Sequence, residues 1–83
     1  MELEELKLDT PAVYTIRIVG MLDEKWSDRL GGMSVTTTSD QDKQTTVTML
    51  TGRLADQAAL LGVLNTLYDY RYPLLSVECL SST

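Results

Sequence analysis

Two short stretches of this chain bring together side chains that could recognise a ligand. Trp26-Ser-Asp-Arg29 places an aromatic ring, a hydroxyl, a carboxylate and a guanidinium within one helical turn, and such residues recur at binding hot spots. Arg53 lies just before Asp56 and Gln57, where an expected helix would present unpaired N–H groups to an anion. A structural role competes in both stretches, because Trp26 lies on an apolar stripe and Asp56 can cap the helix itself. The candidate recognition residues are therefore Trp26, Arg29, Arg53, Asp56 and Gln57.

The other residues offer little for catalysis. The chain has no His and a single Cys, Cys79, so it cannot build the usual zinc, haem or Cys–His sites from its own side chains. The acidic residues fall mostly in an expected tail, a hairpin loop and exposed helix positions, which does not indicate an acid–base pair. We expect no catalytic residue, no metal and no cofactor.

Composition limits the domain count, the partners and the location. A chain of 83 residues with 43% hydrophobic side chains accommodates one domain. Twelve acidic against seven basic residues give a net charge of −5, which disfavours a nucleic-acid partner. The longest apolar stretch, Ala58 to Leu64, is far shorter than the roughly 20 residues that span a bilayer, and the acidic start differs from a signal peptide. We expect a cytoplasmic protein without membrane insertion.

Hydrophobic periodicity predicts six elements. They are a strand at 12–19, a helix within 21–30, strands at 33–38 and 45–51, a helix that begins after Asp56, and a strand at 74–80. Asp23 is the expected N-cap of the first helix, and Gly31-Gly32 ends it. The order β-α-β-β-α-β is typical of a ferredoxin-like sandwich, in which two helices back a four-stranded antiparallel sheet. We expect an acidic flexible tail at 1–10, one α+β domain at 11–80 and a polar end at 81–83.

The strand alternation predicts which sheet face stays uncovered. We expect Val47 and Met49 to face the helices, together with Tyr14, Ile16 and Ile18. The residues expected to form a Thr-rich interaction surface on the opposite, open face are Thr15, Arg17, Thr48, Leu50 and Glu78. No aromatic residue stands at the expected stacking positions on the two central strands, which argues against RNA binding.

Five strings in the sequence resemble the pattern of a family of short bacterial proteins of unknown function. They are Tyr14-Thr-Ile-Arg-Ile-Val-Gly20, Leu22-Asp-Glu-Lys-Trp-Ser27, Leu50-Thr-Gly52, Asp56-Gln-Ala-Ala-Leu60 and Pro73-Leu-Leu-Ser-Val77. The resemblance implies no activity, but it marks Arg17, Trp26, Ser27, Asp56 and Gln57 as the positions to test first. The family usually has Gly shortly before the last string, where this chain has Arg71, so the end of the second helix departs from the pattern.

These observations favour a non-enzymatic interaction or regulatory module that acts as an accessory subunit or a homodimer. Association would use the open Thr-rich face or an edge strand, with Arg17 and Glu78 setting the register. The alternative is a small-molecule sensor or a cofactor-independent enzyme of the dimeric ferredoxin-like type, with its ligand between sheet and helices near Trp26 and Arg53.

Overall fold

A computed structural model describes residues 8–40 and 45–82. Most of the expected acidic tail, part of the hairpin loop and Thr83 lie outside the described residues. The elements in chain order are β1 (Ala12–Val19), the 3₁₀ helix η2 (Glu24–Leu30), β2 (Ser34–Asp40), β3 (Thr45–Leu54), α1 (Gln57–Asp69) and β4 (Leu74–Ser82). The structure confirms an α+β fold with two helices and a four-stranded antiparallel sheet.

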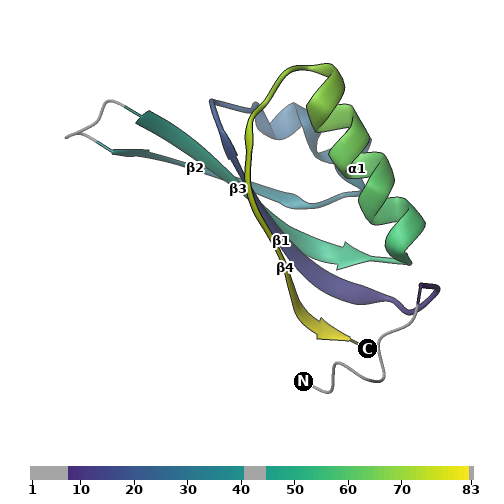
Figure 1. Cartoon of the computed structure of the whole chain (residues 1–83). Helices are drawn as coiled ribbons and strands as arrows, with labels where there is room; N and C mark the ends of the chain where they lie inside the picture. Colours follow the sequence, from purple (N-terminus) through teal and green to yellow (C-terminus); the bar gives the residue numbers. More distant parts are fainter. Residues whose placement is uncertain (1–7, 41–44, 83) are drawn as a thin grey trace.

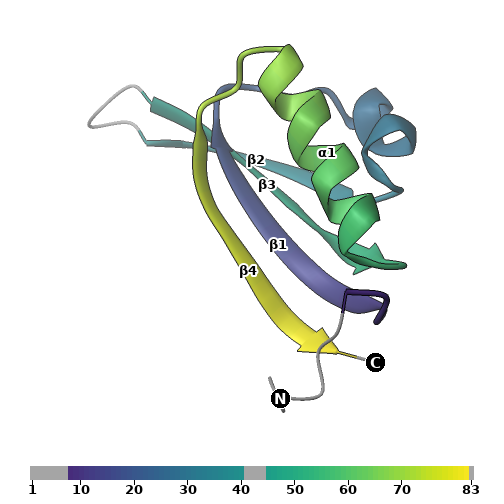
Figure 2. The same cartoon turned by 45° about the vertical axis from the view of Figure 1, so that its right-hand side comes forward.

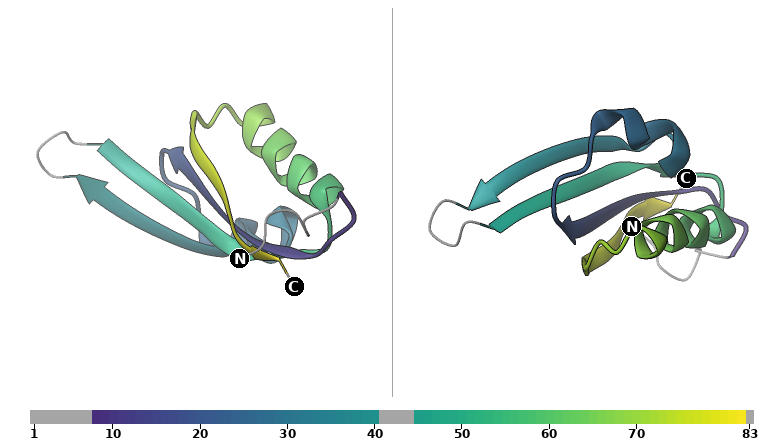
Figure 3. Two further views of the ribbon diagram at one scale, coloured as in Figure 1. Left: turned by 60° about the horizontal axis from the view of Figure 1, so that its bottom comes forward. Right: turned by 90° about the horizontal axis from the view of Figure 1, so that it is seen from above.

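The strands lie in the order β2-β3-β1-β4, and each neighbouring pair is antiparallel. Both helices lie on one side of the sheet (Figures 1 and 2). Seen from above, β2 and β4 form the two outer strands (Figure 3). The core between the helices and the sheet contains Ala12, Tyr14, Ile16, Ile18, Leu22, Leu30, Met33, Leu50, Leu54, Val63 and Leu67.

Strand β1 has the predicted bounds and the predicted facing. Tyr14, Ile16 and Ile18 are buried toward the helices, as alternation along a half-buried strand requires. Arg17 lies between them in sequence and is exposed on the opposite face. This strand therefore fixes which face of its neighbours is covered.

The facing predicted for β3 is wrong. Leu50 pairs with Ile16 and Thr48 pairs with Ile18, so both side chains point toward the helices, and both are 0% exposed. Met49 pairs with Arg17 and belongs to the open face. The physical reason is that the Thr48 hydroxyl is satisfied inside: its Oγ1 donates to the Gly20 carbonyl at 2.6 Å.

The first helix is shorter and tighter than predicted. It is a seven-residue 3₁₀ helix, in which the Trp26 N–H donates to the Asp23 carbonyl at 3.0 Å. Asp23 is its N-cap, as predicted, and its carboxylate accepts from the Lys25 N–H at 3.0 Å. Leu22, two residues before the helix, and Leu30, its last residue, are buried, so apolar contacts hold the chain on both sides of η2.

Helix α1 begins at the predicted cap and ends in a strained turn. The Asp56 carboxylate accepts from the Ala59 N–H at 2.8 Å. At the other end, the Arg71 N–H donates to the Tyr68 carbonyl and the Tyr72 N–H donates to the Leu67 carbonyl, which is the pattern of a Schellman motif. Arg71 holds the left-handed position of that motif with φ 66°. The position therefore favours the glycine that the family pattern has there.

We expect Arg71→Gly to be more stable than Arg71→Ala by about 1 kcal/mol, because only the alanine variant keeps the left-handed strain. Both variants lose the contact of the Arg71 guanidinium with the Tyr68 ring, 5.6 Å from its centroid, so that contact cancels from the comparison. Urea unfolding of the two purified variants measures the difference. Equal stability would contradict a strained turn.

Candidate interaction surface

The open face presents a row of polar side chains on β1 and its neighbours. Thr15 lies between Thr51 on β3 and Glu78 on β4, and the two threonine hydroxyl oxygens are 3.4 Å apart. Arg17 lies between Met49 and Ser76. Thr15, Arg17 and Glu78 therefore share the predicted face, whereas Thr48 and Leu50 are excluded from it by burial.

The open-face positions of β1 and β3 hold no ring on which a base could stack. These positions are Val13, Thr15, Arg17, Val19, Val47, Met49, Thr51 and Arg53. Nucleobase recognition on such a sheet needs aromatic side chains on the central strands. Among the described residues, these positions therefore provide no aromatic platform for a base.

Trp26 and Arg29 join a small aromatic cluster. The rings of Trp26 and Tyr70 meet edge to face with centroids 4.5 Å apart, and the Arg29 guanidinium lies 5.3 Å from the Trp26 centroid. Trp26 is half-buried against the core. The cluster therefore fastens η2 to the end of α1. Sequence reasoning missed Tyr70, because no local pattern joins it to a helix more than forty residues away.

The other candidate recognition residues lie at or just before the start of α1. Asp56 caps the helix, and the Gln57 N–H donates to the Leu8 carbonyl at 2.8 Å. Arg53 is exposed on β3, where it pairs with Val13. The Gln57 and Ala59 N–H groups at this helix start are thus bonded within the chain itself. The structure brings Asp56 and Gln57 together, and it does not join them to the Trp26 cluster.

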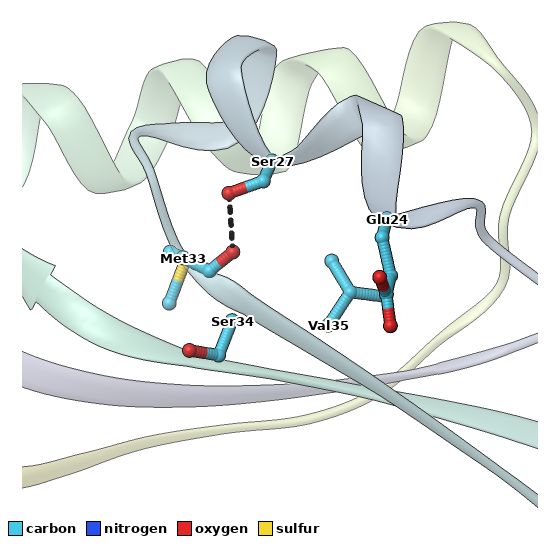
Figure 4. A pocket seen from close by; sticks show the side chains of 5 residues that line it. All are labelled: Glu24, Ser27, Met33, Ser34 and Val35. Atoms are coloured by element: carbon cyan, nitrogen blue, oxygen red, sulfur yellow. Dashed lines mark hydrogen bonds between the residues drawn. The ribbon is translucent and has the colours of Figure 1, made fainter.

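A shallow pocket between η2 and β2 is lined by Glu24, Ser27, Met33, Ser34 and Val35 (Figure 4). The Ser27 hydroxyl donates to the Met33 carbonyl at 2.8 Å, so it ties η2 to β2. Glu24 is the one carboxylate in this lining. The pocket contains neither Trp26 nor Arg53, and it does not pair two titratable groups for acid–base chemistry.

The outer strand β4 carries a concentration of exposed apolar side chains. Leu74, Leu75, Val77 and Leu80 are 52, 53, 38 and 47% exposed. The pairing with β1 shifts register at both ends of the strand, and Leu75 and Leu80 have no partner on β1. We call these four residues, together with the side of β4 that pairs with no other described strand, the β4 edge surface. The sequence shows the residues, but whether a helix covers them depends on the packing.

One flank of α1 continues the β4 edge surface. A hollow of about 380 Å³ lies between them, lined by Leu64, Asn65, Leu67, Tyr68, Tyr72, Pro73 and Leu74. Leu61 and Tyr68 are exposed at helical spacing on this flank, since residues seven apart lie on one face. Apolar side chains from the helix and the strand thus border one surface.

The described residues offer no site for a metal ion, since no group of three His, Cys, Asp or Glu side chains comes together among them. Within residues 8–40 and 45–82, no helix is long and apolar enough to cross a membrane.

A small α+β protein with one uncovered sheet face and one apolar outer strand is the class that these features define. The chain belongs to the family described as a domain of unknown function (DUF8691), whose model matches residues 13–78. This agrees with the resemblance found in the sequence. No curated protein and no solved structure matches the chain significantly.

Proposed function

We propose that this chain is a non-enzymatic interaction module, a regulatory or accessory subunit of the cytoplasm, that associates through its β4 edge surface. The observation that carries the proposal is that four exposed apolar side chains lie on a strand whose outer edge pairs with no other described strand. An exposed edge strand is a template for pairing with another chain. Apolar side chains along it add burial to the main-chain hydrogen bonds.

The other outer strand supports this choice by contrast. On β2, Ser34, Thr36, Thr37 and Thr38 are exposed and polar, and the one apolar residue, Val35, is half-buried. Water can solvate such an edge at little cost, whereas exposed leucines favour burial. We therefore prefer β4 to β2 for edge pairing.

The open face is the weaker alternative. Thr15 is buried, Val13, Val19 and Met49 are half-buried, and the Thr15 hydroxyl already has Thr51 as a neighbour. Arg17 and Glu78 add charge to a surface with little apolar area left to bury. We assign to this face a role in solubility, and the association to the edge.

The strand order β2-β3-β1-β4 supports assigning the domain to the ferredoxin-like sandwich. In that architecture the two central strands are the first and third along the chain, so the first and last elements of the domain lie side by side. An outer last strand is thereby available for association, which fits the proposed function.

Two variants that each change the net charge by −2 test the proposal. Leu75→Glu with Leu80→Glu places charges on the β4 edge surface, and Arg17→Glu places the same change on the open face. We expect the edge variant to lose the associated species, because two carboxylates would be desolvated, and Arg17→Glu to retain it. Light scattering of the purified chain over a hundredfold dilution, and recovery of bound protein from an extract of its own cells, report the association.

Loss of association in Arg17→Glu alone would assign the contact to the open face and overturn the proposal. The proposal is also overturned if both variants associate like the wild-type chain.

The hollow between α1 and the β4 edge surface favours the second candidate function, a small-molecule sensor, because its lining is mainly apolar. A compound that raises the melting temperature in proportion to the logarithm of its concentration, while both variants associate normally, would establish that function instead.

A further inference from the structure

We infer that the partner on the β4 edge surface is β4 of a second copy, paired antiparallel around a twofold axis at Val77 to form a continuous eight-stranded sheet. This inference rests on the proposed function and names its partner. Figure 2 shows β4 as the outermost strand beside β1, so the sheet can extend past it. A twofold axis makes the same patch meet itself, so the patch must be self-complementary.

The residue pattern of β4 selects the register. Directly opposed residues of an antiparallel pair lie on the same face, so the helix-facing residues of one copy must oppose those of the other. With Val77 on the axis, Val77 meets its own copy and Leu75 meets Cys79 of the second copy. Apolar side chains then oppose apolar ones at these positions.

The neighbouring registers are worse. An axis at Glu78 places two carboxylates directly opposite each other, which is destabilising. An axis at Ser76 places Leu74 opposite Glu78 of the second copy, although Leu74 pairs with the helix-facing Ile18 and Glu78 with Thr15 on the open face, so the two faces do not match. The register shifts at the ends of β4 confine regular pairing to the segment around Val77, which further favours an axis there.

An unpartnered hydroxyl supports the same register. The Ser76 Oγ is buried and has no hydrogen-bond partner among residues 8–40 and 45–82. Buried polar atoms without a partner are uncommon, and a hydrogen bond gained on association would remove this one. In the Val77 register, Ser76 lies opposite Glu78 of the second copy. A rotation of the Ser76 side chain would expose its hydroxyl, which could then donate to that carboxylate, and the pair would occur twice by symmetry.

The buried area fits a dimer of modest size. About half of the surface of each leucine in the β4 edge surface is exposed. The exposed fraction is larger for Tyr68, at 68%, and smaller for Val77, at 38%. Covering them together with the main-chain edge removes on the order of 500 Å² per copy, or about 1,000 Å² in total, the lower end of specific interfaces. Glu78 is the one charged residue of β4, so the net charge of −5 lies mostly elsewhere.

Cross-linking of the purified full chain tests the register. In a Cys79→Ser background, Val77→Cys places two thiols opposite each other on the axis. Opposed Cα atoms of antiparallel strands are about 4.5–5.5 Å apart, inside the range that disulfides bridge. We expect mild oxidation to give at least about tenfold more covalent dimer than the matched control Thr36→Cys on the polar edge of β2. Light scattering of the wild-type protein should give a molar mass twice the 9.2 kDa of one chain.

A charged variant provides a second measurement. Val77→Lys places two ammonium groups across the axis and should raise the dissociation constant at least about tenfold, whereas Thr36→Lys should leave it unchanged. Thermal unfolding, measured at a protein concentration below the dissociation constant of the dimer, checks that both variants fold.

A wild-type chain that stays monomeric throughout, with no excess cross-link at Val77, would overturn the second copy as the partner. If the charged-edge variant still lost a protein bound from extract, the proposed function would survive that result. A dimer whose cross-link forms at Thr36 and not at Val77 would overturn both.

Discussion

Leu50→Ala is expected to destabilise the fold by about 3 kcal/mol. The Leu50 side chain is 0% exposed and lies between Ile16 on β1 and Val35 on β2, so its removal leaves a cavity in the centre of the sheet. A chain of this length has a total free energy of unfolding of about 4–12 kcal/mol, so the loss is a large fraction of it. Urea unfolding followed by the fluorescence of Trp26, the single tryptophan, measures the change.

Met49→Ala is the matched control, because Met49 is the adjacent residue on the same strand and is half-buried on the open face. Its truncation should cost about 1 kcal/mol or less, since little enclosed volume is lost. The reverse ranking, with Met49 the more costly residue, would contradict the strand facing described above. The pair of variants therefore tests the side of β3 on which the core lies.

The facing of β3 could not be predicted because Val47-Thr48-Met49-Leu50 has an apolar residue on both alternating sets. A threonine in such a segment is expected to face solvent unless its hydroxyl has a hydrogen-bond partner inside the protein. Thr48 finds its partners in the Gly20 carbonyl and in Thr37, whose hydroxyl oxygen is 3.3 Å away. These residues come from other parts of the chain, so the sequence around Thr48 holds no sign of them.

Features that depend on neighbouring residues were predicted correctly from the sequence. The bounds of β1 and the caps Asp23 and Asp56 depend on neighbours within a few residues, and the structure confirms all three. The departure of Arg71 from the family pattern left the conformation of the helix end open, and the structure gives Arg71 a left-handed φ of 66°. Such features follow from the short-range steric and hydrogen-bonding needs of the backbone.

The candidate site was predicted only in part. Edge pairing along the second or the last strand was expected as a route beside the open face, but the exposure of Leu74, Leu75 and Val77 follows from how α1 lies across the sheet. Their apolar character alone predicts burial. The packing of a helix over a sheet is a long-range property, so the sequence could name these residues and could not show that they stay uncovered.

The second large effect is expected at the end of η2. Gly31→Ala should destabilise the fold by about 2–3 kcal/mol, for two reasons that add. Gly31 has φ 69°, a left-handed conformation that a Cβ disfavours. The new Cβ would also stand 2.7 Å from Cδ2 of Leu54, which is buried and has little room to turn aside.

Gly32→Ala separates the two reasons. Gly32 has a similar φ of 76°, but a Cβ there would meet no atom within 4 Å. Its substitution should therefore cost about 1 kcal/mol, from the backbone alone. Thermal or urea unfolding of the two variants gives the difference, which measures how firmly Leu54 is packed beneath η2. Equal losses of stability in Gly31→Ala and Gly32→Ala would mean that the Leu54 side chain rotates freely. The packing of η2 would then depend chiefly on the contact between Trp26 and Tyr70 at the end of α1.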